Sequence, residues 1–254
     1  MKRELLPNRV FASKWTISCA SGGFFATFIP KNACSTLRLS AALYNGAINS
    51  PSQVNWIHKN NRAFNADDSF IVSSEYAFVI LRCPFARLVS VFLDKFVGKK
   101  PSANAFVRGL DNGMILERFS FSDFILGLSA GNCFLRSNEH WRPQVDFLII
   151  KNYDDYFSVE DLGSAKLSLL KKVGFNLVDS RSLLDHSTKD YVRTDINKAY
   201  NLSVSELSKL KRNESIVPCL RSMFTPGLYE RVSFLYGADV ELYESKTSRK
   251  SFAL

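Results

Sequence analysis

Residues 24–38 read FFATFIPKNACSTLR, and this stretch decides the predicted fold. Its aromatic, apolar start is typical of a buried strand, a Pro-Lys-Asn turn ends that strand, and Ser35-Thr36 opens a segment with apolar residues at helical spacing. The open N–H groups at a helix N-terminus favour phosphate, Ser35 and Thr36 add hydroxyl donors, and Lys31 adds a mobile positive charge. The stretch therefore predicts a phosphate-binding loop between a strand and a helix.

The loop lacks the GxxxxGK[ST] pattern of ordinary ATPases and GTPases, so that interpretation loses its main support. A plain strand-turn-helix with a capping Ser or Thr and a solvated Lys explains this stretch about equally well. Both interpretations stay open on these residues alone.

The length of 254 residues and the 46% of hydrophobic residues fit one compact α/β domain or two small ones. We predict a single domain over residues 1–254, with an N-terminal arm at 1–22 and a frayed tail at 244–254. Lys and Arg outnumber Asp and Glu by 33 to 24, a balance that favours anionic ligands without naming one. The five cysteines are an odd set without a CxxC pair, which argues against a disulfide framework and against a zinc ribbon.

Neither the start of the chain nor its apolar stretches suggest export. Met1-Lys2-Arg3 resembles the basic start of a signal peptide, but polar residues interrupt the apolar region that should follow. The longest apolar stretch, residues 76–93, contains two arginines and a proline, so it cannot cross a bilayer as one helix. We therefore expect a cytoplasmic protein.

A second strand-turn-helix follows in residues 76–98, YAFVILRCPFARLVSVFLDKFVG. Residues 77–81 form a continuous apolar run of parallel-strand character, and Pro84 suits the first turn of a helix. The spacing predicts one buried helical face, with Arg87, Ser90, Asp94 and Lys95 falling elsewhere; the buried positions are Phe85, Leu88, Val89, Phe92 and Phe96. Arg82 and Ser90 together could hold a second phosphate. In the plainer alternative, Arg82 pairs with a carboxylate and Ser90 is simply a small residue of the helix.

Here the two motifs together resemble the PAPS-dependent carbohydrate sulfotransferases of the chondroitin, dermatan and HNK-1 type, sulfotransferase family 2, in a bacterial form. IPKNACSTLR resembles their 5′-phosphosulfate loop, and LRCPFARLVSVFLDKF resembles their 3′-phosphate motif, RxPxxRxxSxxxxK. The resemblance implies an α/β, P-loop-like three-layer fold with a central parallel sheet flanked by helices. It also implies 3′-phosphoadenosine 5′-phosphosulfate (PAPS) as the sulfuryl donor and transfer to a carbohydrate hydroxyl.

The resemblance also implies roles for individual residues. Lys31 is expected to stabilise the leaving phosphate, Arg82 and Ser90 to hold the 3′-phosphate with Arg87 as a weaker candidate, and Lys189 to add a phosphate contact. The residues expected to hold the 5′-phosphosulfate are Pro30, Lys31, Asn32, Ala33, Cys34, Ser35 and Thr36. No metal is needed in this scheme, and none is expected.

Residues 138–144, NEHWRPQ, resemble the HWxPQ segment of the same family. Sulfuryl transfer needs a group that accepts the acceptor's hydroxyl proton, and neutral His140 suits this near pH 7, with Glu139 in reserve. From spacing alone a structural histidine is the commoner explanation, so the catalytic role comes from the resemblance. Further elements are predicted as a third strand at 145–151, helices at 121–130 and 158–174 (buried through Leu162, Leu167, Leu169, Leu170 and Val173), basic helices within 196–224, and a closing helix at 228–243.

The acceptor cannot be identified from the sequence beyond a carbohydrate or glycoconjugate. Leu37-Arg38 stands where relatives commonly have a Trp-Lys pair, which leaves the acceptor open, and residues 45–68 and 99–112 are expected to face it. No nucleic-acid-binding motif occurs, so we expect no nucleic-acid partner. We expect a protein without a transmembrane segment, either free or peripheral at a membrane where glycans are assembled. The sequence leaves its oligomeric state open. A kinase-like phosphotransferase and a non-catalytic acidic-glycan-binding module are the alternative functions.

Overall fold

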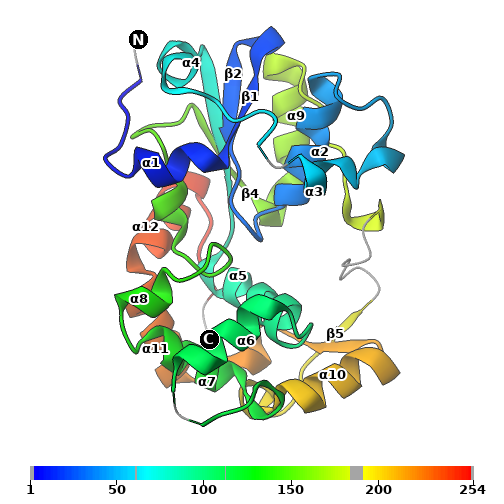
Figure 1. Cartoon of the computed structure of the whole chain (residues 1–254), viewed down its shortest axis with the longest axis vertical. Helices are drawn as coiled ribbons and strands as arrows, with labels where there is room; N and C mark the ends of the chain where they lie inside the picture. The colour runs from blue at the N-terminus through cyan, green and yellow to red at the C-terminus, as the bar shows by residue number, and fades with distance from the viewer. Residues whose placement is uncertain (1–2, 61, 112, 184–190, 253–254) are drawn as a thin grey trace. The chain divides into compact units, whose positions relative to one another are not determined.

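The computed structural model describes residues 3–60, 62–111, 113–183 and 191–252 (Figure 1). The chain divides into two compact units. The first consists of Met1–Arg82, Gln144–Ser187 and Ser245–Ser248, and the second of Cys83–Pro143, Thr188–Glu244 and Arg249–Leu254. Each unit has a sheet of its own, and the single domain expected from the sequence stays a prediction.

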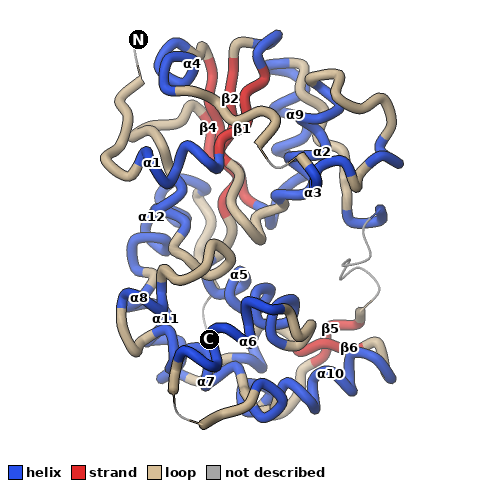
Figure 2. Tube along the Cα trace, viewed as in Figure 1, coloured by secondary structure: helices blue, strands red, loops and turns tan. Residues whose placement is uncertain are grey.

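The first unit contains a four-stranded sheet in the order β1-β2-β3-β4. Figure 2 shows its strands in red. The strands are β1 (Thr16–Cys19), β2 (Phe24–Thr27), β3 (Tyr76–Leu81) and β4 (Asp155–Ser158). β2, β3 and β4 run parallel, whereas β1 pairs antiparallel with β2. The predicted α/β fold with a central sheet is confirmed. The sheet is mixed rather than fully parallel because its edge strand β1 is antiparallel to β2. β1 lies within residues 1–22, predicted as an N-terminal arm.

Helices α2 and α9 pack against this sheet. Leu37 and Ala41 of α2 and Leu169 of α9 join Phe24 and Phe78 of the strands in one buried cluster. The helices and short helical turns of this unit are α1 (Arg9–Ala12), η1 (Ser13–Trp15), η2 (Ala20–Gly22), α2 (Cys34–Tyr44), η3 (Pro51–Gln53), α3 (Trp56–Lys59), α4 (Asp68–Ser73), η6 (Gln144–Phe147), η7 (Val159–Asp161), α9 (Leu162–Val173) and η8 (Arg181–Leu183).

Two predictions about this unit are wrong. Residues 145–151 are not a strand of the sheet: they begin in η6, and Ile150 makes only an isolated bridge with Leu5. The apolar run is buried without being a strand, since burial alone does not distinguish the two. In α9, Leu167 and Leu170 are exposed rather than buried, because the face that packs runs through Ala165 and Leu169.

The second unit is built around aromatic side chains. Phe92 and Phe96 pack against Phe124, and Phe96 and Phe124 also contact Trp141, all at ring-centroid distances of 4.6–6.1 Å. Its elements are α5 (Pro84–Val91), the π-helical turn η4 (Phe92–Phe96), α6 (Pro101–Gly109), η5 (Leu116–Arg118), α7 (Phe121–Leu128), α8 (Asn132–Leu135), β5 (Val192–Thr194), η9 (Ala199–Asn201), α10 (Val204–Asn213), β6 (Ile216–Pro218), η10 (Arg221–Met223), α11 (Pro226–Leu235) and α12 (Gly237–Thr247). The five positions predicted for the buried face of residues 85–96 are all buried.

The C-terminal segment differs from the prediction of one closing helix followed by a frayed tail. Two helices, α11 and α12, occupy the region, and the backbone N–H of Ser251 donates to Glu244 at 2.9 Å. The ring of Phe252 packs against Phe85 at 6.0 Å. No helix within the described ranges is long and apolar enough to cross a membrane.

Candidate functional site

The loop between β2 and α2 has the backbone of an anion-binding site. Lys31 and Ala33 adopt positive φ angles of 71° and 55°. Ala33 is left-handed and is followed by the helical Cys34, an alternation that turns successive N–H groups toward one concave surface. Ala33, the N-cap residue of the 11-residue helix α2, provides no side-chain cap. The first N–H groups of α2, with the positive end of its dipole, are therefore arranged to receive an anion.

The two hydroxyls in the first turn of α2, those of Ser35 and Thr36, have different surroundings. Thr36 is buried, and its Oγ1 lies 3.1 Å from Oγ of Ser180 and accepts from the Ser180 backbone N–H at 3.3 Å. Ser35 is half-buried. The Thr36 hydroxyl is thus engaged by Ser180, whereas the Ser35 hydroxyl lies nearer the surface. The phosphate-binding role of both residues stays a prediction.

Arg82 meets the loop at the carboxyl edge of the sheet. Because β2 and β3 are parallel neighbours, the residues that follow them emerge at the same edge. Nη1 of Arg82 donates to the backbone oxygen of Lys31 at 2.9 Å. The structure therefore brings together two residues that the sequence assigned to separate motifs.

Asn32 and Gln144 form a buried amide pair behind this loop. Nδ2 of Asn32 donates to Oε1 of Gln144 at 2.6 Å and to the backbone oxygen of Ile80 at 3.0 Å. Within the described ranges, Oδ1 of Asn32 is buried without a hydrogen-bond partner. The sequence prediction used Asn32 for its backbone and missed Gln144, which could have been noticed as an amide directly before the apolar run of residues 145–150.

In the second unit, Arg87 is buried rather than outside the packed face of α5. Its guanidinium donates to the backbone oxygens of Arg142 at 2.8 Å and Glu139 at 3.3 Å. Arg87 therefore holds the backbone of the NEHWRPQ segment, which favours a structural role for this residue over a phosphate contact. Ser90, on the same helix, is half-buried.

His140 is oriented by its neighbours in the NEHWRPQ segment. Oδ1 of Asn138 lies 3.0 Å from the backbone nitrogen of His140 and 2.7 Å from its Nδ1. Since the backbone N–H can only donate, Asn138 presents its oxygen, Nδ1 carries the proton of the neutral ring, and Nε2 keeps its lone pair. Glu139 also approaches Nδ1, with Oε1 at 3.4 Å. The sequence prediction missed Asn138.

Two further expectations concern Lys189 as a phosphate contact and the metal-free site. Lys189 lies outside the described residues. Within the described ranges, no group of three His, Cys, Asp or Glu side chains is arranged to hold a metal ion.

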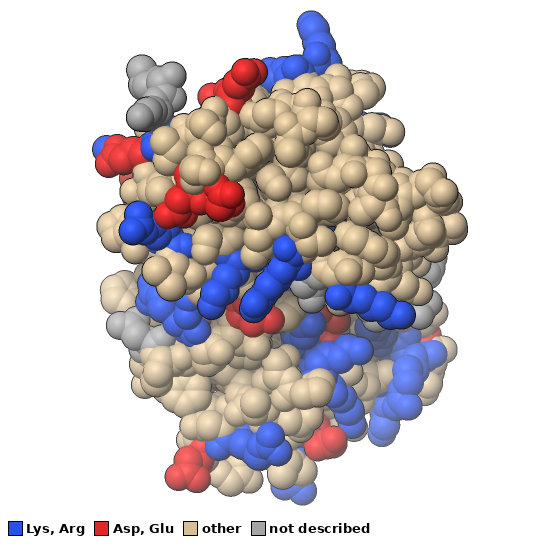
Figure 3. All heavy atoms as spheres, turned by 45° about the horizontal axis from the view of Figure 1, so that its top comes forward, with Lys and Arg blue, Asp and Glu red and all other residues tan. Residues whose placement is uncertain are grey.

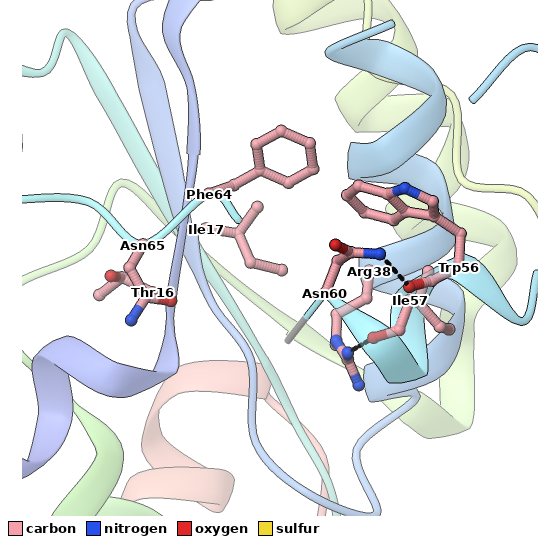
Figure 4. Close-up of a pocket in the computed structure, with 8 residues that line it drawn as sticks. All are labelled: Thr16, Ile17, Arg38, Trp56, Ile57, Asn60, Phe64 and Asn65. Carbon is pink, nitrogen blue, oxygen red and sulfur yellow. Dashed lines mark hydrogen bonds between the residues drawn. The ribbon is translucent and has the colours of Figure 1, made fainter. Parts of the chain in front are cut away.

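A small hollow lies between β1, α2 and part of the segment 45–68, which the sequence predicts to face the acceptor (Figure 4). Arg38 donates to the backbone oxygen of Ile57 there, and Asn60 donates to that of Trp56 at 3.0 Å. Burial lowers the pKa of the Arg38 guanidinium. The hollow has a volume of about 10 Å³, room for one water molecule, so it is too small to hold a nucleotide or a sugar ring as it stands.

Comparison with known proteins identifies the family to which the chain belongs. Neither the curated proteins nor the solved structures contain a significant match to the chain. The model of a sulfotransferase family matches residues 17–245, a range that includes both strand-turn-helix motifs and the NEHWRPQ segment. The chain belongs to the sulfotransferase family.

Proposed function

We propose that this protein transfers the sulfuryl group of PAPS to a hydroxyl of a carbohydrate acceptor. The observation that carries the proposal is the loop of residues 28–33, which leads through the N-cap residue Ala33 into α2 and whose Lys31 backbone oxygen accepts from the guanidinium of Arg82. The excess of Lys and Arg side chains, evident on the face drawn in Figure 3, suits anionic substrates.

The donor set of the loop fits PAPS. The N–H groups of residues 33–36 and the hydroxyl of Ser35 are suited to the 5′-phosphosulfate, and Lys31 provides a cation on the preceding loop. The N–H of Asn32 instead donates to the backbone oxygen of Ile29 at 3.0 Å. Arg82 and Ser90 are assigned to the 3′-phosphate, the group that distinguishes PAPS from ATP. When bound, PAPS supplies the sulfuryl group and departs as adenosine 3′,5′-bisphosphate. The Lys31 ammonium offsets the negative charge that grows on the leaving phosphate oxygen.

His140 is assigned the acid–base step. Its neutral ring holds a proton on Nδ1 toward Asn138, and its Nε2 lone pair is the site that accepts the proton of the attacking hydroxyl. Glu139, also adjacent to Nδ1, stays the reserve candidate for the base. The proposal includes a cytosolic location, a bacterial type of enzyme and a donor site that needs no metal. The proposed acceptor is a glycan or glycoconjugate.

Thermal unfolding with three ligands in parallel tests the donor assignment. Adenosine 3′,5′-bisphosphate, 5′-AMP and ATP with magnesium are each added at about 100 times the expected dissociation constant, where a ligand adds roughly 2.7 kcal/mol of stability. We expect the bisphosphate to raise the midpoint most. A rise with ATP and magnesium alone would favour a phosphotransferase. Binding that ignores the 3′-phosphate and falls steeply with salt would favour an acidic-glycan-binding module.

The transfer itself is measured with PAPS labelled in the sulfuryl group and a panel of uronate-containing, neutral and lipid-linked glycans. Label in one glycan class identifies the acceptor. Bisphosphate binding without transfer to any glycan would contradict the carbohydrate assignment and leave the donor assignment intact.

A further inference from the structure

Gln144 is fully buried, and its side-chain amide binds the backbone of Arg82 on both sides. Oε1 accepts from the Arg82 N–H at 3.0 Å, and Nε2 donates to the Arg82 backbone oxygen at 2.9 Å. A neighbouring strand would satisfy the same two groups in the same way. The side chain of Gln144 therefore takes the place of a neighbouring strand at Arg82, the residue that follows β3.

The same amide also reaches the phosphate loop. Oε1 of Gln144 accepts a second hydrogen bond, at 2.6 Å, from Nδ2 of Asn32. Arg82 in turn donates from its guanidinium to the backbone oxygen of Lys31 at 2.9 Å. Gln144, Arg82 and the loop thus form a closed set of hydrogen bonds within the first unit.

This arrangement fixes the direction of the Arg82 side chain and the path of the loop, both of which matter for anion binding. The direction of the Arg82 side chain depends on its backbone, which Gln144 holds at both the N–H and the carbonyl group. The path of the loop depends on Asn32, which is held by Gln144 and by the carbonyl oxygen of Ile80. A binding site whose donors are already in place loses less conformational entropy when the ligand arrives.

We propose that Gln144 is a positioning residue that makes the loop of residues 28–33 and Arg82 a single preorganised site for the two phosphates of the donor. The proposal rests on the proposed function, in which Arg82 binds the 3′-phosphate. It also gives the two ends of the NEHWRPQ segment different roles, because His140 acts on the acceptor hydroxyl and Gln144 acts on the donor site.

The test is a double-mutant cycle read out as a ratio of binding constants. Isothermal titration gives the dissociation constants of 5′-AMP and of adenosine 3′,5′-bisphosphate, and their quotient measures how well the 3′-phosphate is recognised. In the wild type we expect Arg82→Ala to lower this quotient about tenfold to a hundredfold, as for loss of a hydrogen bond to a charged group. Gln144→Met, which keeps the volume and removes the amide, is expected to lower it similarly. Arg82→Ala in the Gln144→Met background is then expected to change it by less than about threefold.

A purely structural role for Gln144 predicts a different result. Gln144→Met would then lower stability, but the folded protein would keep the wild-type quotient, and Arg82→Ala would cost the same factor in both backgrounds. Either result overturns the proposal. Tyr153→Phe is the matched control, because it removes buried hydrogen bonds to Thr27 and Ile149 in the same unit without touching the loop, and we expect an unchanged quotient.

Should Gln144→Met fail to fold, Gln144→Glu carries the same cycle. The ionised glutamate keeps the shape and the acceptor oxygen but removes the N–H that donates to the Arg82 carbonyl, so a reduced quotient is again expected. A wild type that binds 5′-AMP as tightly as the bisphosphate would overturn the proposed donor site itself. A wild type that prefers the bisphosphate, combined with an unchanged quotient in both Gln144 variants, would overturn only the positioning role.

Discussion

Oδ1 of Asn138 lies within hydrogen-bond distance of both the backbone nitrogen and Nδ1 of His140, at 3.0 and 2.7 Å. This pair of contacts orients the ring and leaves Nε2 as its proton acceptor. The relationship resembles the way in which a carboxylate orients the histidine of a hydrolase, with an amide oxygen in its place.

The first prediction concerns this pair. His140→Ala is expected to abolish sulfuryl transfer and to leave the affinity for adenosine 3′,5′-bisphosphate within about twofold, because general-base catalysis contributes about 10²- to 10⁴-fold to rate and nothing to donor binding. Asn138→Ala is expected to lower kcat about tenfold or more at unchanged KM for the donor, since the ring loses its orientation. Steady-state transfer assays check both.

Asn138→Asp is the matched control, because it keeps an oxygen at the position that faces Nδ1. It should retain more activity than Asn138→Ala. Wild-type turnover in the His140 variant would remove this residue from the mechanism, and wild-type kcat in Asn138→Ala would remove the positioning role of the amide.

The second prediction separates Arg87 from Ser90, which the sequence placed in one phosphate motif. Arg87 is buried and donates to two backbone oxygens, so Arg87→Met is expected to lower the free energy of unfolding by about 2–4 kcal/mol. Ser90→Ala is expected to change it by less than about 0.5 kcal/mol but to weaken bisphosphate binding several-fold. Urea unfolding and titration of the same samples measure both quantities. A stable Arg87→Met protein that no longer binds the bisphosphate would reverse the assignment.

The two strand-turn-helix motifs could be predicted because each combines a continuous apolar run with a turn residue and a helical period. β2 and β3 therefore lie where the sequence indicated, and Pro84 begins α5. β1 is a four-residue edge strand, too short for its pattern to stand out, and β4 carries polar residues at its start. Residues 145–150 are as apolar as a strand, but the chain there packs without pairing in the sheet.

The candidate site could be predicted only in part, for a physical reason. Residues that carry charge or nucleophilic chemistry, such as Lys31 and His140, are recognisable by type. Asn138 and Gln144 act through hydrogen bonds to specific groups, some of them distant in the sequence, and an amide has no spacing that reveals its partner. Such residues become visible only when the fold has placed both ends of the hydrogen bond.

The third prediction distinguishes the two hydroxyls in the first turn of α2. Thr36 bonds to Ser180 in a buried position, so Thr36→Val is expected to lower the free energy of unfolding by about 1–3 kcal/mol by leaving the Ser180 groups without this partner. Ser35→Ala should leave stability nearly unchanged and weaken 5′-AMP binding about threefold to tenfold. Equal losses of affinity in both variants at unchanged stability would contradict this division.

The fourth prediction concerns Lys31. Lys31→Ala is expected to lower kcat about 10²- to 10³-fold, with a smaller effect on bisphosphate affinity, because charge on the leaving oxygen develops only in the transition state. Lys166→Ala, which removes an exposed lysine from α9 in the same unit, is the control and should transfer the sulfuryl group normally. A Lys31→Ala enzyme with normal kcat and raised KM would assign the lysine to ground-state binding instead.

The last prediction is a loss of stability at alkaline pH that originates in the core of the first unit. Burial raises the pKa of the Cys19 thiol from 9.0 to about 12, and burial raises that of Tyr153 from 10.0 to about 12. Both groups are neutral when protonated, so the unfolded chain releases these protons at lower pH than the folded protein. Their contribution is therefore intact below pH 9 and falls as pH rises toward 12, by up to about 1.4 kcal/mol per pH unit for each group.

Urea unfolding at a series of pH values between about 8 and 10.5 measures this slope. Cys19→Ala is expected to flatten the part that begins near pH 9, even though it removes some packing, because no thiol then remains to ionise on unfolding. Ile17→Val, which removes packing from the same buried cluster but keeps the Cys19 thiol, should keep the wild-type slope. An identical pH dependence in the wild type and in Cys19→Ala would show that the alkaline loss arises elsewhere, and Tyr153→Phe then tests the later part of the curve, which begins near pH 10.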